Sequence, residues 1–265
     1  DVTGTVENMS LIASSIMSKK LAAGSDAIVL DVKCGSGAFM KTEEDSFALA
    51  KEMVTIGRNA GRKMSAVISD MDQPLGRAVG NAIEVREAIY TLMGKGPEDF
   101  TELVYTLGTQ MLILGGITSS EKEAVEMLKE SVRSGKALDK LAAFVEAQGG
   151  DKSYVYEPEK LLLAPIEKKV YAPCDGFVSH IDCDEIGICS LMLGGGRETK
   201  ESNIDLTVGL YLDKKVGDEV KAGESLAILY ASSEEKIGPV CERFLKAYHF
   251  SKEQKAANKL IRGII

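Results

Sequence analysis

Three residues near the start of the chain have types and a spacing that suit the binding of a flat polar ligand. The pattern predicts a helix over residues 10–23, which Gly24 would end. That helix places Ile12, Ser15 and Lys19 at i, i+3 and i+7, on one face. An apolar side chain, a hydroxyl and an ammonium on one face could hold a flat polar ligand. An ordinary solvated face has the same pattern, and the spacing alone leaves both interpretations open.

A second stripe of the same helix should fix its orientation. Ala13, Met17 and Leu21 follow at i, i+4 and i+8 and are apolar, which suits packing on a sheet. Residues 27–33 form a continuous apolar run, typical of a strand buried on both faces, and residues 63–70 form a second strand. We therefore expect the chemistry-bearing face to be held by a helix that packs on strands.

Helix signals between and after these strands indicate an α/β fold. Thr42 with Asp45 resembles a capping box and opens a helix to Asn59, which Gly61 ends. Further helices are expected over 81–93, 100–114, 120–134 and 137–148. Strand–helix–strand order predicts right-handed crossovers and a parallel sheet covered by helices.

The character of the sequence changes after residues 149–151. Segments at 167–173, 175–182, 205–213 and 215–231 read as strands joined at glycine turns, followed by a helix over 234–248 and a basic tail. We predict a partial α/β catalytic domain over 1–155 and a smaller, β-rich α+β domain over 156–265.

Composition limits the classes of function. The chain has 265 residues, 45% of them hydrophobic and 27% charged, which is ordinary for a globular protein. A net charge of −8 argues against a nucleic-acid binder. No apolar run approaches the roughly twenty residues of a membrane span, and no signal-peptide pattern opens the chain. We expect a cytoplasmic enzyme without nucleic-acid or membrane partners.

Two local patterns invite a functional interpretation but are weak. His180 and Cys183 lie three residues apart, yet the chain has only two histidines and no second ligand pair for a metal. The turn Gly35–Gly37 lacks the third glycine of a dinucleotide fingerprint and the Gly-Lys-Ser ending of a phosphate-binding loop. The odd number of cysteines, five, favours reduced thiols over a disulfide framework. We assign no site to these patterns.

Three segments carry a family resemblance. DVTGTV at 1–6, LIASSIMSKKLAAGSDAIVLDVKCGSGAFMKT at 11–42 and SDMDQPLGRAVGNAIEVREAI at 69–89 together closely resemble the pyrimidine-nucleoside phosphorylase and thymidine phosphorylase family. The resemblance extends over the whole chain. Gly4 departs from it, because alanine is expected there, and we take this as a packing variation.

The resemblance implies a substrate site and a cation site. Ser15 and Lys19 would contact the pyrimidine and Ile12 would pack on it. The carbonyl oxygens of Leu75 and Ala78 and the carboxylate of Glu87 would bind a monovalent cation, K+, and no organic cofactor is implied. The substrates would be a pyrimidine nucleoside, such as uridine, thymidine or deoxyuridine, and phosphate. No residue of the chain is assigned as catalytic.

The resemblance also implies that this chain is the C-terminal portion of a longer, homodimeric enzyme. The helical lobe, the phosphate-binding segment, an arginine expected just before Asp1 and the remaining cation ligands would lie upstream. The chain alone is then expected to be inactive and to bind the cation poorly. The alternative is a non-catalytic binding or scaffold protein that retains the fold.

A third possibility comes from the second half of the chain. The segments APCDGFV and VGDEVKAGESLAILYA also resemble biotinyl and lipoyl carrier domains. Tyr230-Ala231-Ser232 stands where such a domain carries its attachment lysine, which disfavours a carrier function.

Overall fold

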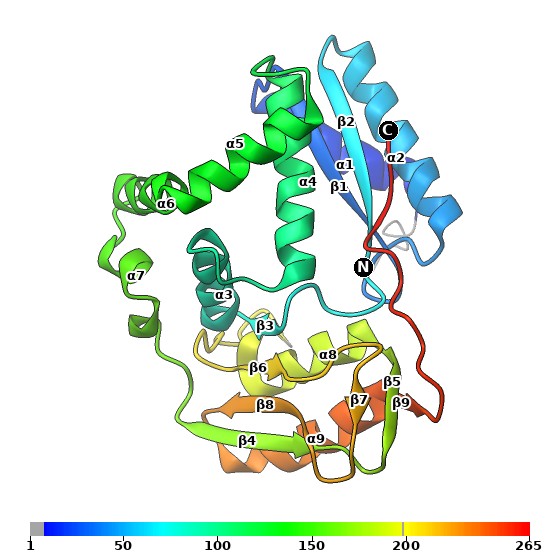
Figure 1. Cartoon of the computed structure of the whole chain (residues 1–265), viewed down its shortest axis with the longest axis vertical. Coiled ribbons are helices and arrows are strands. Elements are labelled where there is room, and N and C mark those ends of the chain that lie inside the picture. Colours follow the sequence, from blue (N-terminus) through cyan, green and yellow to red (C-terminus); the bar gives the residue numbers. More distant parts are fainter. Residues whose placement is uncertain (1–7, 198) are drawn as a thin grey trace. The chain divides into compact units, whose positions relative to one another are not determined.

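A computed structural model describes residues 8–197 and 199–265, which fall into two compact units (Figure 1). Unit 1 comprises Asp1–Met71, Thr101–Glu130 and Lys259–Ile265, and unit 2 comprises Asp72–Phe100 and Ser131–Asn258. The segment DVTGTV with Gly4 lies outside the described residues. The predicted division into 1–155 and 156–265 is a different partition of the chain, and it stays a prediction.

Unit 1 contains a three-stranded sheet in the order β1-β2-β10. Its elements are α1 (Met9–Ala22), β1 (Ala27–Cys34), α2 (Glu43–Asn59), β2 (Lys63–Asp70), most of α4 (Glu98–Leu114), most of α5 (Glu121–Arg133) and β10 (Ile261–Ile264). β1 and β2 are parallel, with Ala27 opposite Lys63, as the strand–helix–strand order predicts. β10 is antiparallel to β2, so the sheet is mixed.

The helices of unit 1 begin and end at local signals. The Asn8 side chain accepts a hydrogen bond from the Leu11 amide at 3.1 Å and caps α1. Gly24, with φ +75°, follows the end of that helix. Thr42 caps α2 by accepting a hydrogen bond from the Asp45 amide at 3.1 Å. The predicted helix boundaries are confirmed to within one or two residues.

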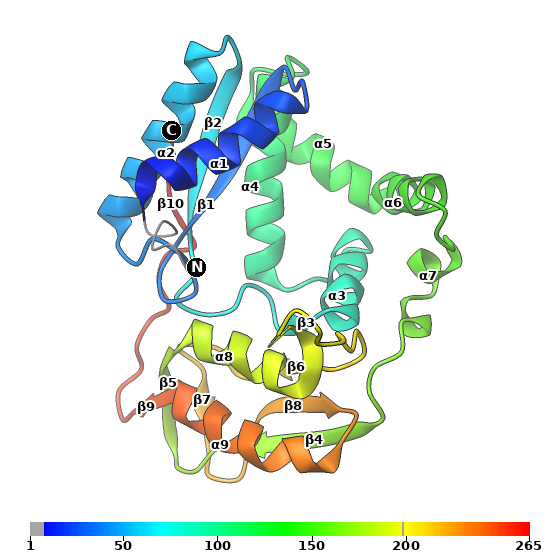
Figure 2. The same ribbon diagram turned by 180° about the vertical axis from the view of Figure 1, so that it is seen from behind.

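One face of the β1–β2 pair carries the core of unit 1. Ala13 and Met17 of α1 are completely buried in one hydrophobic cluster with alternate residues of both strands and the inner side of α2 (Figure 2). Leu21, the third member of the predicted apolar stripe, is only partly buried at the edge of this cluster. The stripe therefore orients α1 through its first two members.

The other face of β1 differs from the prediction of a strand buried on both sides. Asp31 and Lys33 form an ion pair of 2.7 Å there, and Ser69 donates a hydrogen bond to Asp31 at 2.6 Å. Asp31 is exposed and Lys33 is half-buried among the described residues. The apolar run thus supplies one buried face, because every second residue of a strand points to the same side.

Unit 2 contains two antiparallel sheets, in the orders β3-β6-β8-β4 and β7-β5-β9, around one hydrophobic cluster. Its elements are β3 (Ala78–Gly80), α3 (Ala82–Leu92), α6 (Lys136–Ala147), α7 (Ser153–Tyr156), η1 (Pro158–Lys160), β4 (Ile166–Tyr171), β5 (Gly176–Ile181), α8 (Cys183–Ser190), η2 (Leu191–Gly195), β6 (Gly209–Leu212), β7 (Glu219–Val220), β8 (Ser225–Ala231), η3 (Glu234–Lys236), α9 (Ile237–Ala247) and β9 (Tyr248–Ser251).

The predicted fold class, an α/β part followed by a β-rich α+β part, is confirmed. Several elements differ from the sequence prediction, and three of them illustrate the reason. α8 lies in a segment for which no helix was expected, β3 is a short strand before α3, and residues 261–264 form a strand where a basic tail was expected. Each of these differences depends on pairing or packing with residues far away in the sequence.

Candidate functional site

The candidate substrate-binding residues lie along α1 as the spacing predicts. Ile12 is half-buried against the core of unit 1, whereas Ser15 and Lys19 are exposed. Among the described residues, the Ser15 hydroxyl and the Lys19 ammonium have no hydrogen-bond partner. The backbone carbonyl of Lys19 is used, because it accepts a hydrogen bond from Ala23 at 3.1 Å in the last turn. The helix therefore presents a hydroxyl and an ammonium on a rigid backbone.

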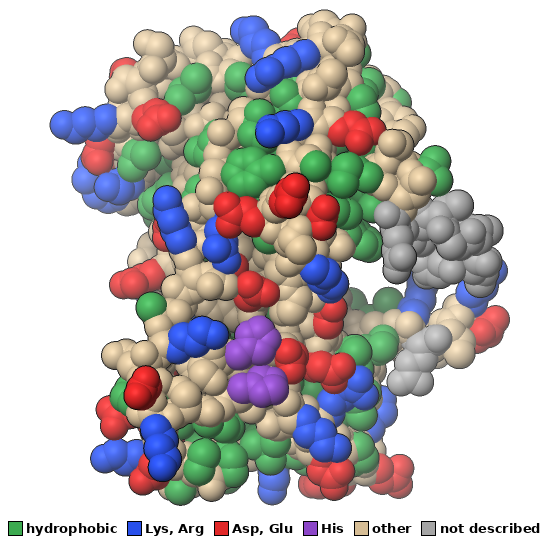
Figure 3. Space-filling model, turned by 90° about the vertical axis from the view of Figure 1, so that its right-hand side faces the viewer, with side chains coloured by type: hydrophobic (Ala, Val, Ile, Leu, Met, Phe, Trp, Pro, Cys, Tyr) green, Lys and Arg blue, Asp and Glu red, His purple; other side chains and the backbone are tan. Residues whose placement is uncertain are grey.

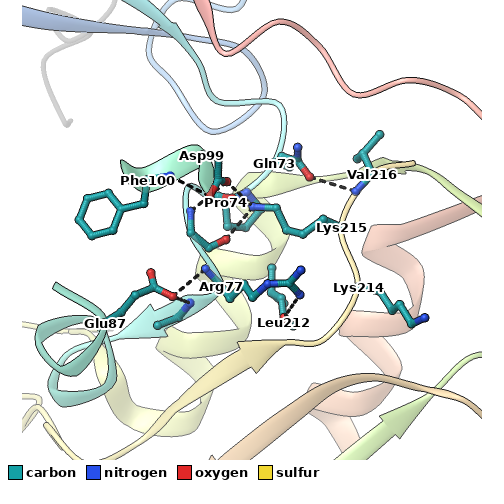
Figure 4. A network of polar contacts seen from close by, with 12 residues as sticks. Gln73, Pro74, Arg77, Glu87, Asp99, Phe100, Leu212, Lys214, Lys215 and Val216 are labelled. Atoms are coloured by element: carbon teal, nitrogen blue, oxygen red, sulfur yellow. Dashed lines mark hydrogen bonds and ion pairs between the residues drawn. The ribbon is translucent and has the colours of Figure 1, made fainter. Parts of the chain in front are cut away.

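Two of the candidate cation-binding residues, Ala78 and Glu87, come into contact in unit 2, and Leu75 lies three residues before Ala78. The carboxylate of Glu87, on α3, accepts hydrogen bonds at one oxygen, Oε1, from the Arg77 amide at 2.9 Å and from the Ala78 amide at 3.1 Å (Figure 4). The Leu212 amide donates to the Arg77 carbonyl, so Arg77 and Leu212 form a hydrogen-bonded pair at the start of the β3–β6 ladder. Ala78 is the next residue along β3 and therefore lies at a non-hydrogen-bonded position of this ladder. At such a non-hydrogen-bonded position both backbone groups point away from the partner strand. The Ala78 carbonyl therefore points away from β6, like its amide.

Gly76 allows the Glu87 carboxylate to approach the backbone closely. Gly76 has φ +66°, and a Cβ atom built on it would lie 2.1 Å from the second carboxylate oxygen of Glu87. Partial burial raises the pKa of Glu87 above its ordinary value. The two amide hydrogen bonds lower this pKa, but their effect is smaller than that of burial. Carboxylate and backbone carbonyl oxygens are the kinds of ligand that suit a hard cation. The half-buried carboxylate of Glu87 is a ligand of this kind.

A cavity of about 370 Å³ borders this turn. Its lining includes Ala78 and Glu87, together with Arg77, Tyr211 and Tyr230. The guanidinium of Arg77 is already engaged, because it donates to the carbonyls of Leu212 and Asp213. The cavity gives the carboxylate of Glu87 access to small solutes.

Lys215 is a residue of this region that the sequence did not single out. It lies between β6 and β7, and its ammonium reaches the turn that carries Leu75. It donates to the carbonyls of Pro74 and Gly76 and to the carboxylate of Asp99. In the sequence it belongs to a Lys-Val-Gly-Asp turn between two strands, and no local pattern connects it to residues 74–76.

The weaker patterns have structural explanations. In the Gly35–Gly37 turn, the Gly35 amide donates to the Met40 carbonyl and the Gly37 amide to the Met71 carbonyl. The nearby Lys41 ammonium donates to the Ser36 carbonyl at 2.6 Å. These amides are thus engaged in holding the turn rather than directed at a phosphate.

The two histidines are neighbours on the surface, as Figure 3 shows. His180 and His249 each hydrogen-bond to the carboxylate of Asp182 at 2.9 Å. Within residues 8–197 and 199–265, no group of three or more histidine, cysteine or acidic side chains is arranged to hold a metal ion.

Two further observations bear on the classes considered. Tyr230 and Ala231 are the last two residues of β8, and both pair with β4. None of the helices in the described part of the chain has the length and apolar character needed to cross a bilayer.

Comparison with known families gives two matches that together cover most of the chain. Residues 1–138 match the family described as "Glycosyl transferase family, a/b domain". Residues 177–251 match the "Pyrimidine nucleoside phosphorylase C-terminal domain". The first of these matches covers more than half of the chain and places it in the glycosyl transferase family with an a/b domain.

Comparison with curated relatives identifies a particular family within this class. The chain is 58% identical over 234 residues to a pyrimidine-nucleoside phosphorylase of Staphylococcus haemolyticus. The aligned residues make up 88% of this chain and 54% of that protein. The chain is 55% identical over 265 residues to that of Bacillus subtilis, covering 100% of this chain and 61% of the relative. The chain belongs to the pyrimidine-nucleoside phosphorylase family. It spans between half and two thirds of the length of these relatives.

Proposed function

We propose that the protein catalyses phosphorolysis of pyrimidine nucleosides, converting uridine, thymidine or deoxyuridine with phosphate to the free base and (deoxy)ribose 1-phosphate. The observation that carries this proposal is the identity of 55–58% to curated pyrimidine-nucleoside phosphorylases over most of the chain. Because the chain spans 54–61% of those proteins, the activity is proposed for the protein as its gene encodes it.

Phosphorolysis makes a demand that the face of α1 can meet. The departing pyrimidine develops negative charge, and preorganised donors that face this charge lower the barrier. The exposed Lys19 ammonium and Ser15 hydroxyl are suitable donors for the carbonyl oxygens and ring nitrogen of the base. Ile12 would pack on the ring. The residues that hold phosphate are not assigned to this chain.

The first experiment compares two adjacent lysines. In the protein as its gene encodes it, Lys19→Ala should lower kcat for uridine phosphorolysis by about 10²-fold or more, because a donor to the developing charge is lost. Lys20→Ala is the matched control, since Lys20 is also exposed in the last turn of α1 but belongs to a different face. Equal losses in both variants would reject the assigned role. No phosphorolysis in the unmodified protein would favour the non-catalytic binding or scaffold alternative.

We propose further that Leu75, Ala78 and Glu87 take part in binding a monovalent cation, K+. The proposal is supported by the donor set and by the close approach of the Glu87 carboxylate to Gly76. When bound, the cation would supply a positive charge between the turn and α3. The Arg77 and Ala78 amides, which donate hydrogen bonds to the Glu87 carboxylate, would keep this carboxylate in place.

Thermal unfolding in KCl and in tetramethylammonium chloride tests the cation site. A ligand that binds only the folded state raises Tm, so K+ should stabilise the protein as its gene encodes it. Glu87→Gln keeps an oxygen acceptor for both amides but removes the charge, and should abolish the K+ effect. Glu84→Gln is the control, because Glu84 also accepts a backbone hydrogen bond, from Gly80 at 3.0 Å. An undiminished K+ effect in Glu87→Gln would reject the site.

Homodimerisation and a cytoplasmic location are also proposed, together with the absence of an organic cofactor. The dimer is inferred from the family alone, and sedimentation equilibrium of the encoded protein tests it. The location is supported by the five cysteines, none of which forms a disulfide among the described residues, as expected in a reducing compartment.

A further inference from the structure

The Lys215 ammonium is held by three oxygen atoms. It donates to the carbonyl of Pro74, to the carbonyl of Gly76 at 2.6 Å and to Oδ2 of Asp99 at 3.0 Å (Figure 4). An ammonium has three N–H donors and no acceptor, so all of its donors are used. The Lys215 side chain is only 12% exposed. A charge that is so far removed from water must be paired and hydrogen-bonded.

The oxygen atoms around this ammonium are held by other parts of unit 2. Asp99 lies in the first turn of α4, and its carboxylate also accepts hydrogen bonds from the Gly76 amide at 3.2 Å and from the Phe100 amide at 2.8 Å. The Gln73 side chain accepts a hydrogen bond from the Val216 amide at 3.0 Å. The turn at residues 73–76 and the loop carrying Lys215 are therefore tied together at more than one point.

This arrangement has the composition of a monovalent-cation site. Two backbone carbonyls and one carboxylate supply oxygen atoms and a single negative charge, as a hard, singly charged cation requires. The position of the cation is taken by a side chain of the protein itself. K+ and NH4+ have the same charge and similar size, so either could replace the ammonium of a lysine in such an oxygen cage.

We propose that Pro74, Gly76 and Asp99 form a monovalent-cation cage that Lys215 occupies as a tethered ammonium. Lys215 is thereby a positioning residue for the turn that contains Leu75. Its contacts direct the Pro74 and Gly76 carbonyls toward one side of the turn. On α3, Glu87 holds the amides of Arg77 and Ala78. The link to Leu75 rests on the proposed cation function, whereas the cage itself does not.

Chemical rescue tests the cage in the protein as its gene encodes it. Lys215→Ala removes the tethered ammonium and leaves its oxygen partners. In tetramethylammonium chloride, whose cation is too large for the cage, its Tm should fall by roughly 5–10 °C relative to the unmodified chain. Ammonium or methylammonium chloride at the same ionic strength should restore at least half of this loss. The unmodified chain should show no comparable response, because its cage is occupied.

Two control variants separate cage occupancy from general salt effects. In Lys215→Met, an uncharged side chain occupies the space of the aliphatic part of the lysine. This variant should be destabilised, but ammonium should not rescue it, because the space is already filled. Lys214→Ala removes the neighbouring lysine, which pairs with Glu224 at 2.6 Å outside the cage, and should not respond specifically to ammonium. If Lys215→Ala does not fold on expression, the same comparison is made on its refolding yield from urea, which must rise in methylammonium.

Specific results would overturn the cage. It is rejected if methylammonium leaves both the Tm and the refolding yield of Lys215→Ala unchanged, or if Lys214→Ala and Lys215→Met respond as strongly. No nucleoside is used in this experiment. If the protein proved to have no phosphorylase activity, the rescue of Lys215→Ala would still be expected. If the rescue failed, the proposed K+ site would still be decided by its own test, the comparison of the unmodified protein with Glu87→Gln.

Discussion

At the scale of single residues, Tyr248 shows how a buried polar group is satisfied. It lies in the core of unit 2, stacked on Phe244 with 4.6 Å between the ring centroids, and its hydroxyl donates to the Lys214 carbonyl at 2.9 Å. Burial raises the pKa of this hydroxyl far above its ordinary value. At neutral pH the phenol is therefore a neutral hydrogen-bond donor.

Tyr248→Phe should keep the stacking and lose the hydrogen bond. We expect the free energy of unfolding to fall by about 1–2 kcal/mol, because the Lys214 carbonyl loses its buried donor. Urea unfolding measures the change. Tyr171→Phe is the control, since Tyr171 is 52% exposed and its substitution should change stability by no more than about 0.5 kcal/mol. Equal effects in the two variants would contradict this account.

Asp182 gives a pH-dependent prediction. The hydrogen bond from His249 is the largest cause that lowers the pKa of this carboxyl; partial burial opposes it, and the hydrogen bond from His180 adds to it. A lowered pKa in the folded state means that the carboxylate contributes stability above its ordinary pKa of about 3.9. That contribution is lost as the pH falls through the lower value of the folded state.

The difference in Tm between the unmodified chain and Asp182→Asn should therefore be largest above about pH 5 and shrink on acidification. Calorimetry between pH 3 and pH 7 measures it. In the background His180→Asn/His249→Asn, where both hydrogen bonds are lost, Asp182→Asn should have little pH-dependent effect. A difference that grows as the pH falls would refute the assignment.

The candidate site was predictable from the sequence only where its residues share one element. Ser15 and Lys19 lie on one helix face, and the helical period brings such residues together. Leu75, Ala78 and Glu87 came from the family resemblance, because no local pattern connects a turn to the middle of the next helix. Lys215 was missed because it is 139 residues from Gly76 in the sequence.

At the scale of elements, local capping signals gave the most accurate predictions. Thr42 accepts a hydrogen bond from the Asp45 amide at 3.1 Å and donates to the Asp45 carboxylate at 2.7 Å. Thr42→Ala should lower the free energy of unfolding by about 1 kcal/mol, whereas Thr42→Ser keeps the cap and should be close to neutral. Urea unfolding distinguishes these outcomes, and an equal loss in both variants would exclude the cap as the cause.

Elements that depend on distant partners were predicted poorly. β10 exists because Ile261–Ile264 pairs with β2, and Arg262 binds the buried Asp70 at 2.6 Å. A four-residue segment near a basic stretch carries no local sign of such pairing. β1 was predicted as a strand, but its partly exposed face was not, since burial depends on what covers the sheet. The sequence thus predicts helices and their ends better than the environment of strands.

At the scale of the whole molecule, the described residues form two separate hydrophobic clusters. One lies in unit 1 and contains Ile68, and the other lies in unit 2 and contains Leu210, each completely buried. A cluster of this kind is the usual basis of a cooperative unfolding unit. We therefore expect two transitions in differential scanning calorimetry, although the chain passes between the units four times.

Core substitutions should assign these transitions. Ile68→Ala and Leu210→Ala each create a cavity that costs about 2–5 kcal/mol, so each should lower the midpoint of a different transition. The volume-conserving Ile68→Leu and Leu210→Met should shift the same transitions by much less. If both alanine variants instead lowered one common transition equally, the clusters would belong to a single cooperative system. Two separately shifted transitions would mean that the phosphorylase-family fold is stabilised here by two cores, each of which tolerates damage to the other.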